Sequence, residues 1–111
     1  MRTRIIAGSV AVAAVVAAGT AIAATPVFKG SVGPGFVISM AKKPTKAGKI
    51  TLVVADKSNI HNFHLIGPGV DVKTSIPATG TKMFHLTLKK GTYTFVCDPH
   101  KSIMHGSFTI K

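Results

Sequence analysis

From residue 36 onward the chain consists of short runs in which apolar and polar residues alternate, separated by turn residues. Runs of this length and period are typical of the strands of a β-sandwich or barrel. We find no internal repeat and no long helical period, so we predict one all-β domain of roughly seven strands. The runs that carry this prediction are residues 36–40, 50–55, 60–66, 81–88, 92–97 and 107–110.

The phase of the alternation predicts which side chains face the core, because residues two apart in a strand lie on the same face of the sheet. His85 is out of phase with its apolar neighbours and is expected to face solvent. Lys89–Gly91 is expected to be a hairpin connection, and segment 72–80 has no clear pattern. The predicted core positions are Phe84, Leu86, Leu88, Tyr93, Phe95, Cys97, Phe108 and Ile110.

Residues 1–24 differ in composition from the rest of the chain. A basic N-terminus precedes an uncharged run that ends in small residues, with an Ala-x-Ala pattern at Ala21 and Ala23. We predict a signal peptide over residues 1–24, which directs export, followed by a single domain over residues 25–111. The alternative is an uncleaved membrane anchor, because about 20 apolar residues span a bilayer.

The domain after the predicted signal peptide is strongly basic. Its 12 lysines stand against three aspartates, for a net charge of +9, and it has no arginine or glutamate. Such a surface fits an acidic protein partner or transient contact with an anionic membrane surface. Nucleic acid is not expected as a partner, because the chain is predicted to be exported and has few aromatic residues for base stacking. A lysine-rich soluble surface with no partner is the alternative.

One segment gathers the side chains that bind soft metals. Cys97 is the only cysteine, and His100 and Met104 follow it directly after a predicted strand. A lone cysteine forms no internal disulfide, and a small domain often needs a bound metal for stability. Two histidines, one cysteine and a weak axial methionine form a blue-copper site. The segment therefore predicts three of four copper ligands, with zinc as the competing metal.

The second histidine must come from elsewhere in the chain. His61 shares its predicted strand face with Phe63, which is expected in the core, whereas His64 lies on the opposite face. Alternation therefore favours His61 as the ligand, with His64 as the alternative. His105 is adjacent to Met104 and offers a competing donor, but it is expected to be an exposed loop residue.

These residues together resemble the cupredoxin family, of the plastocyanin and pseudoazurin type. The resemblance rests on His61-Asn62, on the run Tyr93-x-Phe-x-Cys-x-Pro-His and on the later Met104, and it covers roughly residues 35–111. Two features depart from plastocyanin-like sites: three residues separate the loop histidine from Met104, and a further histidine, His64, follows the first.

The resemblance implies a Greek-key β-sandwich that binds one copper ion. It also implies that Asn62 braces the ligand loops through hydrogen bonds. The ligands that it implies are His61, Cys97, His100 and Met104.

The function that the resemblance implies is single-electron transfer between exported redox partners by a monomer. Electrons are then expected to pass through the exposed edge of His100, ringed by apolar residues such as Pro68, Pro99 and Ile103. A copper carrier or storage protein with the same ligands is the alternative. An enzyme with a cysteine nucleophile is not expected, because it needs a base, an orienting group and a substrate cleft, for which so short a chain leaves little room.

Overall fold

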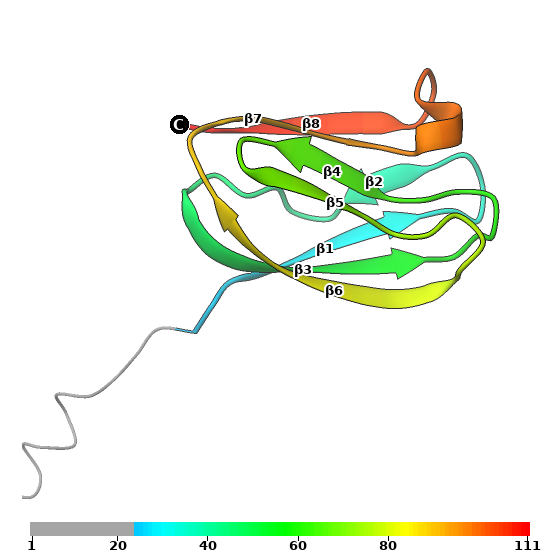
Figure 1. Cartoon of the computed structure of the whole chain (residues 1–111), viewed down its shortest axis with the longest axis horizontal. Helices are drawn as coiled ribbons and strands as arrows, with labels where there is room; N and C mark the ends of the chain where they lie inside the picture. The colour runs from blue at the N-terminus through cyan, green and yellow to red at the C-terminus, as the bar shows by residue number, and fades with distance from the viewer. Residues whose placement is uncertain (1–23) are drawn as a thin grey trace, which may run out of the picture.

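The computed structural model describes residues 24–111, which form a sandwich of two β-sheets (Figure 1). One sheet has the strand order β2-β1-β3-β6 and the other has the order β5-β4-β7-β8. The all-β sandwich is therefore confirmed, with eight strands instead of seven. The strands are β1 (Val27–Val32), β2 (Ile38–Met40), β3 (Gly48–Asp56), β4 (His64–Gly67), β5 (Val70–Lys73), β6 (Gly80–Leu88), β7 (Gly91–Val96) and β8 (His105–Ile110).

The predicted signal peptide, or anchor, lies outside the described residues except for Ala24. Between residues 24 and 111 no helix is long and apolar enough to cross a membrane. Both sheets and the hydrophobic core are complete between Val27 and Ile110, so residues 25–111 contain the whole sandwich.

The core lies between the two sheets, and every core position predicted from alternation is either buried in it or packed against it. The Phe63 ring stacks on Phe95 with ring centroids 5.5 Å apart, and the Tyr93 ring stacks on Phe108 at 5.1 Å. Removing such side chains from water stabilises the fold by roughly 25 cal/mol per Å² of apolar surface. The packing leaves little free space, because a Cβ added at Gly67 would clash with the ring of Tyr93.

The expected hairpin at Lys89–Gly91 is wrong. β6 and β7 belong to different sheets, so this segment carries the chain from one sheet to the other. The tyrosine hydroxyl of Tyr93 accepts a hydrogen bond from the backbone N–H of Lys89 at 2.7 Å and contacts the carbonyl oxygen of Pro68 at 3.2 Å. The side chain of Tyr93, and not hydrogen bonding between paired strands, therefore holds the connection between β6 and β7 in place.

The strand predicted over residues 60–66 is also shorter than expected. β4 begins only at His64, and the preceding residues His61, Asn62 and Phe63 are all buried. In a strand, alternation would have turned Asn62 to the opposite face from His61. Irregular backbone in residues 61–63 removes that constraint, so all three side chains point inward.

Strand pairing places the connecting segments at two opposite ends of the sandwich. Gly48 pairs with Leu88, and Gly91 pairs with Ile110, so these strand ends lie together. We name this end the lysine pole; it consists of residues 24–26, 41–49, 89–90 and 111. The opposite end, the loop pole, consists of residues 33–37, 57–63, 74–79 and 97–104. Figure 1 shows the lysine pole near the C-terminus and the loop pole at the orange turn.

Candidate metal centre

Cys97 lies at the loop pole, directly after β7, and begins a loop that folds back on itself. A short 3₁₀ turn, η2 (Asp98–His100), follows it, with a proline in its first turn. The backbone N–H of His100 donates to the carbonyl of Cys97 at 3.0 Å, and that of Met104 donates to the carbonyl of His100 at 2.9 Å. The N–H of Cys97 in turn donates to the carbonyl of Met104 at 3.1 Å. These bonds hold the three residues near one another.

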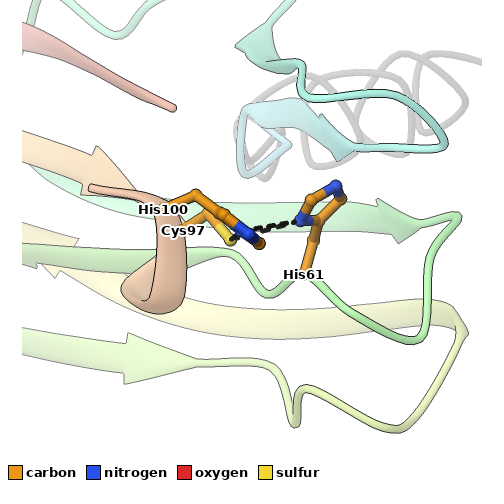
Figure 2. Close-up of side chains that lie close together, drawn as sticks. All are labelled: His61, Cys97 and His100. Carbon is orange, nitrogen blue, oxygen red and sulfur yellow. Dashed lines mark hydrogen bonds between the residues drawn. The ribbon is translucent and has the colours of Figure 1, made fainter. Parts of the chain in front are cut away.

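Three side chains converge at this pole, as Figure 2 shows. The Nδ1 atoms of His61 and His100 are 3.1 Å apart, and the Cys97 sulfur lies 3.6 Å and 3.5 Å from them, respectively. His61 and Cys97 are completely buried, and His100 is half-buried. Among the described residues this is the one group of three or more His, Cys, Asp and Glu side chains whose ligand atoms approach closely enough to hold a metal ion.

The spacing of these atoms fits a trigonal metal site. Metal–nitrogen and metal–sulfur bonds of about 2.0–2.3 Å, at angles of about 120°, separate neighbouring ligand atoms by roughly 3.5–3.7 Å. The observed separations of 3.1–3.6 Å are close to this range. His61 Nε2 is buried without a hydrogen-bond partner among residues 24–111, so Nδ1 is the nitrogen of this ring that meets polar atoms. The donor set of two imidazoles and a thiolate suits copper.

Met104 is buried beside the same loop. Its side chain is 1% exposed, and its backbone is bonded to both Cys97 and His100. The assignment of Met104 as the axial ligand, and of His61, Cys97 and His100 as the other ligands, remains a prediction from the sequence. His105 is exposed, as expected, but it begins β8 and does not lie in a loop. His85 is exposed as well, and its ring nitrogen lies 3.2 Å from the Thr51 hydroxyl.

Asn62 makes the hydrogen bonds that the resemblance implies. Its side-chain oxygen accepts from the backbone N–H of Asp98 at 2.8 Å, and its amide nitrogen donates to the Asp98 carboxylate at 2.9 Å. The same nitrogen contacts the carbonyl of Thr74 at 3.3 Å. Asn62 therefore connects the segment that carries His61 to the loop that carries Cys97.

His64, the alternative ligand, is not part of the converging group. One ring nitrogen, Nδ1, lies 2.8 Å from the carboxylate of Asp98, and the other, Nε2, lies 2.6 Å from that of Asp71. A neutral imidazole donates from only one nitrogen. Two carboxylate partners therefore favour the doubly protonated ring, an imidazolium that links β4, β5 and the Cys97 loop.

The electrostatics of this link agree with its geometry. Burial alone would lower the pKa of His64, but the hydrogen bonds and charges of Asp98 and Asp71 outweigh it and raise the pKa above the ordinary value of 6.5. Burial likewise opposes the charge on Asp98, yet Asn62, His64 and Lys101 hold the pKa of Asp98 below its ordinary 3.8. No signal in the sequence indicates this pairing, because Asp71 and Asp98 are far apart along the chain.

Exposed apolar side chains share the loop pole with the half-buried His100. The Phe36 ring packs edge-on against both imidazoles, with centroids 5.1 Å from His61 and 5.0 Å from His100. The strand expected over residues 36–40 begins only at Ile38, so Phe36 lies in a loop and is free to cover the site. The exposed large apolar side chains of the loop pole are Phe36, Val37, Ile60, Ile76 and Ile103.

The expected position of Pro68 near His100 is wrong. Pro68 lies in the turn between β4 and β5 at the other end of the sandwich, where its ring faces Gly91 and its carbonyl contacts Tyr93. Pro99 and Ile103 do lie exposed on the Cys97 loop, as expected.

Comparison with known proteins supports both the fold and copper binding. A family model for copper-binding proteins of the plastocyanin/azurin family matches residues 39–111. Among solved structures the chain is similar to reduced rusticyanin, with 20% identity over 82% of each chain and a TM-score of 0.61. It is also similar to auracyanin A, a "blue" copper protein from the green thermophilic photosynthetic bacterium Chloroflexus aurantiacus, with 15% identity over 79% of this chain and 100% of that one and a TM-score of 0.53.

A second auracyanin, from the photosynthetic bacterium Roseiflexus castenholzii, matches with 18% identity over 81% of this chain and 99% of that one, at a TM-score of 0.55. At such identities these likenesses show the fold alone. No curated protein sequence matches the chain.

Proposed function

The chain is a cupredoxin, a member of the plastocyanin/azurin family of copper-binding proteins with one copper ion as its cofactor, and we propose that it carries single electrons between exported redox partners. The observation that carries the proposal is the convergence of the His61, Cys97 and His100 donor atoms beneath an exposed apolar surface. Copper, when bound there, supplies a one-electron couple between Cu(I) and Cu(II).

We assign the ligands as His61, Cys97, His100 and Met104. Buried His61 and Cys97 come from two segments that Asn62 connects, so the protein holds these donors in place before any ion arrives. Preorganised donors rearrange little between oxidation states, which favours rapid transfer. The hydrogen-bonded loop between Cys97 and Met104 adds to this rigidity.

His100 is the route by which electrons enter and leave. It is the half-buried member of the converging group; Phe36 packs against its ring, and Val37, Ile60 and Ile103 are exposed apolar side chains at the same pole. A small apolar face suits a transient redox encounter, which buries less surface than a stable complex. The partner is thus expected to dock at the loop pole, as a redox protein that meets a monomer of this chain.

Most of the lysines are too far from this face to form it, and only Lys57 and Lys101 lie in the segments of the loop pole. Seven of the lysines lie at the lysine pole, at the other end of strands up to nine residues long. A rise of about 3.3 Å per residue places them roughly 25–30 Å from the loop pole. Charges act over only about 10 Å at 0.1 M salt, so these seven lysines contribute little to docking at this face.

A visible spectrum of the copper-loaded domain is the first test. An intense thiolate-to-copper band at red wavelengths is expected, and a colourless Cu(II) protein would contradict the ligand assignment. The alternative function, a copper carrier, is tested by mixing the reduced protein with a Cu(I) chelator of moderate affinity. Slow copper loss is expected of an electron carrier, whereas rapid loss without electron exchange would support the carrier.

A further inference from the structure

The basic charge of the domain is concentrated at the end opposite the metal centre. The β2–β3 connection, the crossing from β6 to β7 and the C-terminal residue all meet there. All of the lysines in these segments are exposed, and the lysine pole contains no acidic residue. They are Lys42, Lys43, Lys46, Lys49, Lys89, Lys90 and Lys111.

The three aspartates lie outside the segments of this pole, and each is hydrogen-bonded; Asp71 is the nearest, two residues beyond the β4–β5 turn. The carboxylate of Asp56 accepts from the N–H of Ser58 at 3.1 Å and from the hydroxyl of Thr74 at 3.2 Å. Asp71 and Asp98 both face His64. The lysine pole therefore has no aspartate or glutamate side chain within it to neutralise its field.

The chain also enters the domain at this pole. Pro26 and Phe28 line one groove together with Lys42, Lys46 and Lys49. The residues that directly precede the domain, 5–24, are an uncharged apolar run in the sequence. If that run spans a membrane, the lysines lie at the end of the domain that faces it.

We propose that the lysine pole binds the surface of an anionic phospholipid bilayer and turns the loop pole toward the aqueous phase. Lysines near a negatively charged leaflet each strengthen binding by about fivefold, and the attraction extends only about 10 Å at 0.1 M salt. Lysines clustered at one end therefore reach the leaflet together, whereas lysines spread over the sandwich would not. The benefit for electron exchange rests on the proposed function, but the binding itself does not.

The test uses copper-loaded residues 25–111, which contain the whole sandwich, with vesicles of equal parts phosphatidylglycerol and phosphatidylcholine. The pole variant replaces four lysines with glutamine: Lys42→Gln, Lys46→Gln, Lys49→Gln and Lys89→Gln. The control variant makes the same change in net charge away from the pole: Lys29→Gln, Lys57→Gln, Lys73→Gln and Lys82→Gln. All eight of these lysines are exposed, so both variants keep the core.

We expect the wild-type domain to sediment with these vesicles at 0.05 M salt and to be released as salt rises. The pole variant should bind several hundredfold more weakly, and the control variant no more than about tenfold more weakly. Equal weakening in both variants would overturn the proposal, because total charge alone would then explain binding. Equal binding to pure phosphatidylcholine, or binding to soluble polyanions but not to vesicles, would overturn it as well.

A second measurement uses the unmodified sequence and avoids any effect of substitution on folding. Vesicles should protect Lys46, Lys49 and Lys89 from acetylation, as read by mass spectrometry, while Lys57 and Lys101 at the loop pole stay reactive. The reverse pattern would mean that the loop pole contacts the lipid. The visible spectrum, recorded in the same samples, tests the copper site separately, so a colourless domain that still binds vesicles would contradict the proposed function alone.

Discussion

The loop pole and the lysine pole are two ends of one sandwich with different surfaces. The loop pole exposes Phe36, Val37, Ile60 and Ile103 together with the half-buried His100, and its one aspartate, Asp98, is hydrogen-bonded to Asn62. The lysine pole exposes seven lysines and no acidic side chain. An apolar face favours close, brief contact with another protein, whereas a field of one sign attracts an extended surface of opposite charge. One end is thus suited to electron exchange and the other to attachment.

This separation permits both contacts at once. Attachment through the lysines leaves the metal centre uncovered, because the β-strands hold the two surfaces apart. Each substitution below is therefore expected to change the properties of one pole and to leave those of the other intact.

The largest effect is expected for Cys97→Ser, which removes the only thiol in the chain. The red absorption band should disappear completely, and vesicle binding should not change. His61→Ala should also abolish the band, whereas His64→Ala should leave most of it. A band that survives in His61→Ala and is lost in His64→Ala would show that the wrong histidine is assigned.

A charge placed on the apolar face should slow electron exchange. Ile103 and Met83 are similarly exposed, at 62% and 59%, but Met83 lies on β6, away from the metal centre. Ile103→Lys should slow electron self-exchange roughly a hundredfold, because like charges brought face to face cost several kcal/mol. Met83→Lys adds the same charge and should change the rate little. Similar slowing in both variants, measured by relaxation of NMR lines, would place the contact elsewhere.

Removing the imidazolium link should make the loop pole less stable. His64→Gln should lower the free energy of unfolding of the copper-free domain by about 1–3 kcal/mol near neutral pH, because it leaves two carboxylates without a charged partner. His85→Gln, which changes an exposed histidine, is the control. Urea unfolding measures both variants, and equal losses would show that the link contributes nothing of its own.

The same link predicts how stability depends on pH. Because the pKa of His64 is raised in the folded state, its contribution is complete below about 6.5 and is lost as pH rises through the folded pKa. Because the pKa of Asp98 is lowered, its contribution is complete above about 3.8 and is lost as pH falls through the folded pKa. The wild type should therefore lose stability above neutral pH, and His64→Gln should show a smaller loss there.

The smallest effect is expected at the lysine pole itself. Tyr93→Phe removes the hydroxyl that bonds to Lys89 and Pro68 but keeps the buried ring. The free energy of unfolding should fall by about 1 kcal/mol, the ordinary net contribution of a hydrogen bond. The visible spectrum should stay unchanged. A shifted copper band would show that the two ends are coupled through β7.

Local features of the sequence determined much of the fold and part of the candidate site. Alternation identified the buried faces of β6, β7 and β8, because side chains two residues apart share a face whatever the strand pairs with. The spacing of Cys97 and His100 sufficed to place both in one short turn, because a proline and two backbone hydrogen bonds are all that such a turn needs. The preference for His61 over His64 agrees with the geometry, although residues 61–63 are not a strand.

Only the tertiary structure determined which segments lie next to one another. The crossing of Lys89–Gly91 between sheets, the cover of Phe36 over the imidazoles and the position of Pro68 depend on how distant strands pair. The same is true of the two carboxylates around His64 and of the gathering of lysines at one end. Alternation is a property of residues that are neighbours in the sequence. These contacts join segments that are far apart in the sequence, so only strand pairing and side-chain packing bring those segments together.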